Sequence, residues 1–232
     1  MILLNTLVCE IKKKLPFFII LSTILICGAI WLLVSGKATS FLMLNGYHSF
    51  WLDQFFIRYT YVGDGIFAIV LSLLYLIWFR VNRTGWMLLY SFLLSGLVAQ
   101  IFKNLCPSPR PRLFFEYSHI LFFIDGVTLS NSSSFPSGHT TTAFAIATVL
   151  VLALKNAKWQ LVILIIALGV GYSRIYLGQH FLGDVLAGIF IGTVSGLVCV
   201  WGVENNKIKT FSFKKRKEDK SLSLPIQVLI ST

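Results

Sequence analysis

The sequence predicts an all-α integral membrane protein, built as a six-transmembrane helix bundle. Hydrophobic residues make up 56% of the 232 residues and charged residues only 12%, a composition typical of polytopic membrane proteins. Six segments approach the roughly 20 apolar residues that a helix needs to cross the hydrocarbon core. Lysine and arginine cluster in the short segments between these apolar runs, as membrane topology requires. The expected transmembrane helices lie near residues 15–34, 62–79, 86–102, 140–154, 159–172 and 185–203.

The first apolar segment, Leu15 to Val34, follows three consecutive lysines and is long enough to span the membrane. No small-residue cleavage site follows it, so we expect a retained helix and not a removed signal peptide. The stretch from Phe41 to Tyr61 is rich in aromatic residues with scattered polar ones. It is interpreted either as an amphipathic helix along the outer interface or as an aromatic belt that anchors the bundle, and both interpretations stay open.

A short connection containing Arg80 and Arg83 joins the second and third apolar segments. The fourth and fifth segments are short for a membrane span, so we expect neighbouring polar residues to extend their ends below the membrane surface. Backbone at that depth must form helices or be buried in protein. The sixth segment completes a membrane domain over residues 1–206, and a basic cytoplasmic tail, attracted to anionic lipid, covers residues 207–232.

The formal net charge of +11 would suit a nucleic-acid-binding protein, but its distribution between apolar runs leads us to reject nucleic acid as a partner. If the N-terminus is cytoplasmic, most of the 20 lysine and arginine residues fall on the inner side. Both termini are then expected in the cytoplasm. The four cysteines lie in separate segments and indicate neither a disulfide framework nor a cysteine-based metal site.

On this topology, three groups of polar residues lie at extracytoplasmic helix ends. A lone lysine at a membrane boundary is usually a snorkelling anchor, but that interpretation does not explain why all three groups face the same side. The groups are Lys103, Arg110 and Pro111; Pro136, Ser137, Gly138 and His139; and Ser173, Arg174, His180 and Asp184.

The chemistry that these groups favour is phosphoryl transfer. The guanidinium groups of Arg110 and Arg174 and the ammonium group of Lys103 could surround a tetrahedral phosphate without a metal. Backbone amides near Ser137 and Gly138, at a predicted helix N-terminus, could bind the same oxygens. A site of this kind acts mainly by positioning the phosphate and neutralising its charge.

Two histidines and an aspartate supply the reactive groups. His180 and Asp184 are four residues apart, so on a helix they share one face, where the carboxylate can orient the imidazole as a nucleophile. His139 then remains as the proton donor to the leaving alcohol. As alternatives, the imidazoles could be structural, or His139, His180 and Asp184 could bind zinc, although the neighbouring cations disfavour a metal ion.

The other histidine and acidic residues are interpreted as loop or interface residues without a chemical role. They are His48, Asp53, Asp64, Glu116, His119 and Asp125.

Together the three groups resemble the signature of the type 2 phosphatidic acid phosphatase family, whose superfamily also includes the vanadium-dependent haloperoxidases. That signature has a Lys, six intervening residues and then Arg-Pro; next comes Pro-Ser-Gly-His; last comes Ser-Arg, followed after five intervening residues by His and after three more by Asp. The sequence matches every position between Lys103 and Asp184.

The resemblance implies a haloperoxidase-like helical core and a bacterial-type enzyme of the inner (plasma) membrane. It implies that His180 attacks phosphorus to form a phosphohistidine, that Asp184 supports it and that His139 protonates the leaving group. No metal or other cofactor is implied. The residues implied to bind phosphate oxygens are Lys103, Arg110, Ser137, Gly138 and Arg174.

The function expected on these grounds is hydrolysis of a terminal phosphate from a lipid headgroup at the extracytoplasmic face, with membrane lipids as surroundings. Phosphatidylglycerophosphate, phosphatidate, a polyprenyl diphosphate and the phosphates of lipid A remain open as substrates. Two alternatives remain: a phosphatase or phosphotransferase for soluble esters, and a non-catalytic lipid-phosphate binder or transporter. The His180 and Asp184 pair favours catalysis, because capture of phosphate needs cations and not a carboxylate-backed imidazole.

Overall fold

The computed structural model describes residues 14–79, 82–116, 124, 127, 133–154, 156, 158–205 and 208–210, and within these ranges it contains helices and no strand. The expected basic tail lies almost entirely outside the described residues. In chain order the elements are α2 (Leu15–Asn45), α3 (Phe50–Tyr59), the 3-10 helix η1 (Thr60–Gly63), α4 (Gly65–Leu73), the π-helix η2 (Leu74–Trp78), α5 (Asn82–Leu105), α6 (Pro111–Phe114), α7 (Gly138–Ala153), α8 (Lys158–Tyr176) and α9 (Leu182–Glu204).

The number of membrane spans in the structure agrees only approximately with the six that the sequence predicts. Four helices, α2, α5, α8 and α9, are long and apolar enough to cross a membrane on their own. The segments Phe50–Gly63 and Gly65–Trp78 pass the same test as a pair bent by 55°. Helix α7 is apolar but has only 16 residues. Counting the bent pair as one span and α7 as another gives the six predicted spans.

The second predicted span is the one that differs most from the structure. It was expected to begin near residue 62, but the helical structure leading into it already begins at Phe50, and the bend falls at Asp64. The Asp64 side chain accepts a hydrogen bond from the amide of Ile66 and so caps the start of α4. At this cap the chain changes direction between two helical segments. The periodicity of apolar residues alone does not predict such a bend.

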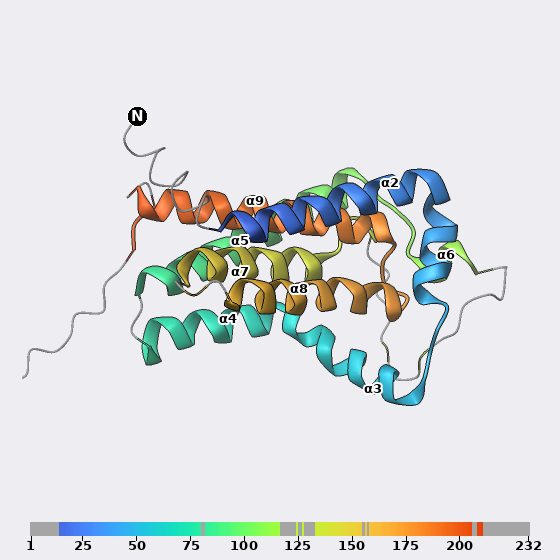
Figure 1. Ribbon diagram of the computed structural model, residues 1–232, viewed down its shortest axis with the longest axis horizontal. Helices are drawn as coiled ribbons and strands as arrows, with labels where there is room; N and C mark the ends of the chain where they lie inside the picture. Colours follow the sequence, from blue (N-terminus) through green and yellow to red (C-terminus); the bar gives the residue numbers. More distant parts are fainter. Residues whose placement is uncertain are drawn as a thin grey trace, which may run out of the picture.

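Helix α2 continues well past Val34, the end predicted for the first span. It bends at Gly36, whose φ of 76° lies in the left-handed region that glycine adopts at little cost. Beyond this bend, residues Lys37 to Asn45 form an outer segment of α2 that leans across the end of the bundle (Figure 1). Part of the predicted interfacial stretch, Phe41 to Asn45, therefore belongs to α2.

Helix α7 lies in the middle of the bundle, between α5, α8 and α9 (Figure 1). Most of its residues are buried, as expected for a helix that is apolar on all sides. Its approach to α9 is close because Gly188, Gly192 and Gly196 repeat every four residues along one face of α9. A Cβ atom at any of these glycines would meet backbone atoms of α7 or the residue before it. Small residues at such spacing let transmembrane backbones touch.

The bundle has two distinct ends. Helix α2 begins and α9 ends at the same end of the bundle, whereas the α8–α9 connection and the start of α7 lie at the opposite end (Figure 1). At the first end, the Lys14 ammonium donates a hydrogen bond to the carbonyl oxygen of Leu154, just after α7. The motif residues therefore meet far from both ends of the described chain.

The glycine contacts yield a matched pair of substitutions for stability. Alanine favours a helix over glycine by about 1 kcal/mol, so Gly96→Ala in α5, where a Cβ meets no atom within 4 Å, should be neutral or stabilising. Gly192→Ala should destabilise the protein by about 1–3 kcal/mol, because its Cβ would press on the carbonyl oxygen of Thr141. Thermal unfolding in detergent measures both, and equal midpoints would contradict the proposed close packing.

Candidate functional site

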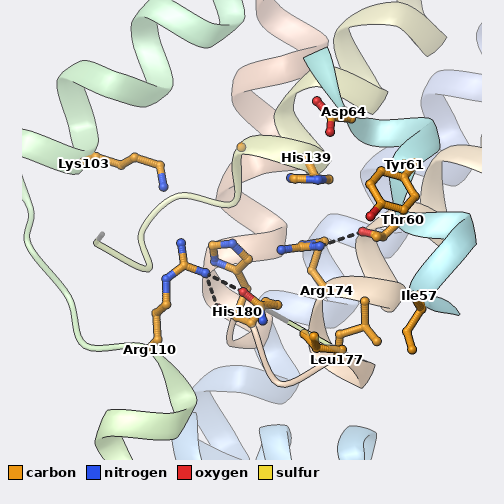
Figure 2. A pocket seen from close by; sticks show the side chains of 13 residues that line it. Ile57, Thr60, Tyr61, Asp64, Lys103, Arg110, His139, Arg174, Leu177 and His180 are labelled. Atoms are coloured by element: carbon orange, nitrogen blue, oxygen red, sulfur yellow. Dashed lines mark hydrogen bonds between the residues drawn. The ribbon is translucent and has the colours of Figure 1, made fainter. Parts of the chain in front are cut away.

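The motif residues surround a cavity of about 410 Å³ at the end of the bundle opposite to the start of α2. Its walls come from η1, α5, the segment before α6, the start of α7, the end of α8 and the segment before α9 (Figure 2). Six of its lining residues are predicted site residues, so segments far apart in the sequence form one cavity. They are Lys103, Arg110, Gly138, His139, Arg174 and His180.

Three cationic side chains converge on this cavity from different elements (Figure 2). Lys103, in the last turn of α5, donates to the carbonyl oxygen of Ser133 at 3.1 Å. Arg110, just before α6, is held by the carbonyl oxygen and the side-chain Oε1 of Gln179, both at 3.1 Å. Arg174, in the last turn of α8, donates to the Thr60 hydroxyl at 2.7 Å, while its Nε is buried without a hydrogen-bond partner. The arrangement suits an anion with several oxygen acceptors.

His180 and Asp184 meet as the sequence predicts, but not on a single helix. Helix α9 begins only at Leu182, so His180 lies in the connection before it and Asp184 lies in its first turn. The His180 Nδ1 atom is 3.6 Å from Asp184 Oδ2, and both side chains are buried. The same oxygen accepts from the Phe181 amide at 2.9 Å. The backbone turn at Phe181, and not helical spacing, therefore brings the imidazole and the carboxylate together.

A serine hydroxyl lies between this pair. Ser134, fully buried, donates to Asp184 Oδ2 at 2.5 Å and lies 3.4 Å from His180 Nδ1. The Ser134 amide donates to the carbonyl oxygen of Ser108, which fixes this segment against the loop after α5. No role was predicted for Ser134, because nothing in its spacing links it to a carboxylate 50 residues away.

The surroundings of His180 favour its neutral form. Burial lowers the pKa of His180 below its usual value, and the positive charges of Arg174 and Arg110 lower it further. The Asp184 carboxylate, whose Oδ2 atom is 3.6 Å from His180 Nδ1, acts in the opposite direction. The net effect is a neutral imidazole at physiological pH, which is the form with a free lone pair.

The Pro-Ser-Gly-His segment begins helix α7, as predicted, with Ser137 as the N-cap residue. Gly138 and His139 line the cavity, and the amides of a first helical turn have no partner within their own helix. Ser137 differs from them, since it is fully buried and does not line the cavity. Its amide donates to the carbonyl oxygen of Asp184 at 3.0 Å, and its hydroxyl pairs with that of Thr140 at 2.8 Å.

The geometry does not support the alternative of a zinc site at His139, His180 and Asp184. Among the residues that the structure describes, no three histidine, cysteine, aspartate or glutamate side chains lie close enough together to hold a metal ion. His139, His180 and Asp184 share the neighbourhood of one cavity without forming a ligand set.

Two further groups were not anticipated from sequence. Asp64 lies in the connection between η1 and α4, as a loop residue would, but it also lines the cavity and acts electrostatically on Arg174, a role that was not predicted. Outside the cavity, Asp53 accepts from the Tyr176 hydroxyl at 2.5 Å and lies 3.3 Å from His48 Nδ1. These contacts tie the start of α3 to the end of α8.

A model of the PAP2 superfamily matches residues 84–208, more than half of the chain. The lipid A 1-phosphatase of Rhizobium johnstonii is 31% identical over 112 residues, which are 48% of this chain and 45% of that protein. The chain therefore matches less than half the length of this curated relative.

Two crystal structures share the fold. That of LpxE from Aquifex aeolicus has a TM-score of 0.59 and 29% sequence identity, covering 71% of this chain and 94% of that one. That of a transmembrane PAP2-type phosphatidylglycerolphosphate phosphatase from Bacillus subtilis has a TM-score of 0.57 and 25% identity, covering 86% and 97%. The predicted all-helical membrane fold is confirmed by both.

Proposed function

The chain belongs to the PAP2 superfamily, and from this premise we propose that it hydrolyses a terminal phosphate from the headgroup of a membrane lipid. One observation carries the proposal. Three cations converge on a cavity that also contains a buried imidazole backed by a carboxylate. Cations alone would serve to capture phosphate, whereas an oriented nucleophile is needed only for its transfer.

In the proposed ground state, the substrate phosphate lies among Lys103, Arg110 and Arg174. Their charge, together with the amides of Gly138 and His139, stabilises the oxygens of the transferring phosphoryl group. Ser137 supports this arrangement as the N-cap of α7, and its buried hydroxyl, paired with that of Thr140, lies outside the cavity lining. Charge compensation is thus assigned to protein groups, and no cofactor has a role in the scheme.

The proposed chemical step is attack of a neutral His180 ring nitrogen on phosphorus, while the bond from phosphorus to the leaving oxygen breaks. Because Nδ1 is directed at Asp184 and Ser134, the attacking atom is Nε2. His139, held protonated in the complex by the phosphate anion, gives this proton to the leaving alcohol, and its neutral ring then takes a proton from the water that hydrolyses the phosphohistidine. The products are the alcohol and inorganic phosphate, with both histidines restored.

The substrate proposed is a phosphomonoester or diphosphate of a lipid, presented from the extracytoplasmic leaflet of the bacterial inner membrane. Similarity to proteins named for lipid A and for phosphatidylglycerolphosphate supports a lipid substrate. The extracytoplasmic assignment is supported by the sequence, because most lysine and arginine residues fall in the segments that the predicted topology places in the cytoplasm. A headgroup panel, assayed with the purified full chain, tests which lipid is preferred.

The nucleophile is tested by His180→Ala, which should abolish turnover, with a loss of at least a thousandfold, while the protein stays folded and binds orthovanadate. Asp184→Asn should be less severe, because the imidazole remains. Turnover is measured as phosphate release, and the intermediate is trapped by acid quenching with radiolabelled substrate. Unchanged turnover in His180→Ala would contradict the scheme, and label retained on another residue would relocate the nucleophile.

Ser134 is tested through the pH profile. Ser134→Ala removes a donor from the Asp184 carboxylate, which then holds the His180 proton more strongly, so the pKa of His180 should rise toward its usual value. The acid limb of kcat/KM should therefore move to higher pH, and kcat should fall by roughly tenfold, the effect of one hydrogen bond to a charged group. Asp184→Asn should move the same limb to lower pH, because the charge that raises this pKa is lost.

Ser133→Ala is the matched control for Ser134, since its hydroxyl contacts Ser108 and Cys106 and not the catalytic pair. Its pH profile should match that of the wild type. If Ser134→Ala lowered activity without moving the acid limb, the hydroxyl would have a packing role only.

The orientation in the membrane is tested with a variant whose only cysteine is Cys106, which is exposed beside the site. A membrane-impermeant maleimide should label it in intact cells. The matched control is Lys158→Cys in the cysteine-free background, at the exposed start of α8 on the opposite end, which should be labelled only in inverted vesicles. The reverse pattern would place the site in the cytoplasm.

A further inference from the structure

A carboxylate lies among the cations of the cavity. Of the described residues that line the cavity, Asp64 is the only one with a carboxylate side chain. It shares the lining with three cations, Lys103, Arg110 and Arg174. A negative charge beside a site for phosphate opposes the binding of that phosphate. Asp64 therefore lowers the affinity of the cavity for phosphate unless it also makes a favourable contact with the substrate.

Asp64 has a structural role that does not require its charge. Its Oδ1 atom accepts a hydrogen bond from the amide of Ile66 at 3.2 Å and caps the start of α4. Asparagine and serine cap helices about as well as aspartate does, so a neutral residue would serve this purpose. Within the part of the chain that the structure describes, no hydrogen bond reaches the second oxygen, Oδ2. That oxygen can accept a hydrogen bond from a molecule in the cavity.

The position of Asp64 relates it to His139. A Cβ atom at Gly63, the preceding residue, would lie 2.7 Å from the carbonyl oxygen of His139 and 3.1 Å from its Cβ, so this turn packs against the start of α7. In the view of Figure 2, His139 lies between Asp64 and His180. Asp64 also acts electrostatically on Arg174. The carboxylate thus belongs to the side of the cavity that His139 forms.

In the proposed scheme, the leaving group lies on this side of the cavity. The attacking atom and the leaving oxygen of a phosphoryl transfer lie roughly in line through phosphorus, so the leaving group points away from His180. His139 gives its proton to the leaving oxygen, which must therefore lie within hydrogen-bond reach of His139. The group that is joined to the phosphate then extends past His139 and lies beside Asp64.

We propose that Asp64 selects the leaving group by accepting a hydrogen bond from a hydroxyl group and by repelling a second phosphate, and this proposal rests on the proposed function. A carboxylate is a strong acceptor for a hydroxyl donor, but it has no proton to donate to a phosphate oxygen. A diphosphate would place its second phosphate against Asp64, and like charges at that distance repel. The preferred substrate is thus a lipid phosphomonoester whose leaving group carries a hydroxyl, as glycerol and sugars do, and a lipid diphosphate is disfavoured.

The repulsion is tested with farnesyl phosphate and farnesyl diphosphate, which differ only in the second phosphate. Asp64→Asn keeps the helix cap and removes the charge. It should raise the ratio of kcat/KM for the diphosphate to kcat/KM for the monophosphate by roughly tenfold. Glu116→Gln, which removes a charge at an exposed position outside the cavity lining, is the matched control and should leave this ratio unchanged. An unchanged ratio in Asp64→Asn would overturn the proposal, because Asp64 would then act on both substrates alike through Arg174.

The hydrogen bond is tested with a second pair of substrates, 1-oleoyl lysophosphatidate and 1-oleoyl-propanediol phosphate, which lacks the free hydroxyl. The wild type should prefer the hydroxylated substrate by roughly tenfold in kcat/KM, the effect of one hydrogen bond to a charged group. Asp64→Ser keeps an oxygen for the cap and has no second oxygen, so the preference should disappear. A preference that persists in Asp64→Ser would assign the hydroxyl to another residue and overturn this part of the proposal.

A binding measurement separates this proposal from the proposed function, because it does not depend on turnover. Farnesyl methylenediphosphonate, whose bridge between the two phosphorus atoms cannot be hydrolysed, is titrated into the full chain in detergent by calorimetry. Asp64→Asn should bind it roughly tenfold more tightly than the wild type does, and Glu116→Gln should bind it as the wild type does. Equal affinities in all three proteins would overturn the role of Asp64. Tighter binding by Asp64→Asn, with no phosphate released from any lipid by the wild type, would support that role and contradict the proposed function.

Discussion

The close approach of α7 and α9 is the constraint on which the site depends. Glycines on α9 allow the two backbones to touch, and the contact is closed by a hydrogen bond from the Ser137 amide to the carbonyl oxygen of Asp184. That bond joins the serine of the Pro-Ser-Gly-His turn to the carboxylate residue of the proposed catalytic pair. His139 and His180 therefore have a fixed separation before any substrate arrives, which is the preorganisation that electrostatic catalysis needs.

The three clustered cations of the cavity destabilise the folded protein, and neighbouring polar residues partly offset this effect. Bringing Lys103, Arg110 and Arg174 together in a partly buried cavity is unfavourable without an anion, because like charges repel and burial removes their hydration. Neutral acceptors, among them the Thr60 hydroxyl and the Gln179 carbonyl, hold the guanidinium groups in place. In the proposed function, binding of the substrate phosphate relieves this repulsion, so the cationic cluster lowers the stability of the protein and raises its affinity for phosphate.

Site residues that occur at fixed spacings within a motif could be predicted from the sequence, and most of them line the cavity. Each predicted residue that lines the cavity belongs to a motif contained in one short segment of the sequence, and the lengths of the apolar segments predicted the helices beside these motifs. The residues are Lys103, Arg110, His139, Arg174 and His180. The bend between α3 and α4 could not be predicted, because a single aspartate cap sets it.

Contacts between distant side chains were equally out of reach. Ser134 and Asp184 lie 50 residues apart, and no periodicity relates a hydroxyl on one loop to a carboxylate on another helix. Such pairs are settled by packing, as is the burial of Ser137 against α9. The direction of the outer segment of α2 could not be predicted either. It is set by the positive φ of Gly36, and sequence composition does not indicate which glycines adopt that conformation.

That outer segment has a consequence for the order in which the protein is made. Asn45, at its end, donates to the carbonyl oxygens of Ile175 and Tyr176, the latter 131 residues later in the chain. Translation at about 5–20 residues per second separates these partners by roughly 7–26 seconds. During that time α2 is in the membrane, and the side-chain amide of Asn45 lacks the two carbonyl acceptors that it has in the folded protein. The connection that carries His180 can therefore take its final form only late in synthesis, after the first helix has long been inserted.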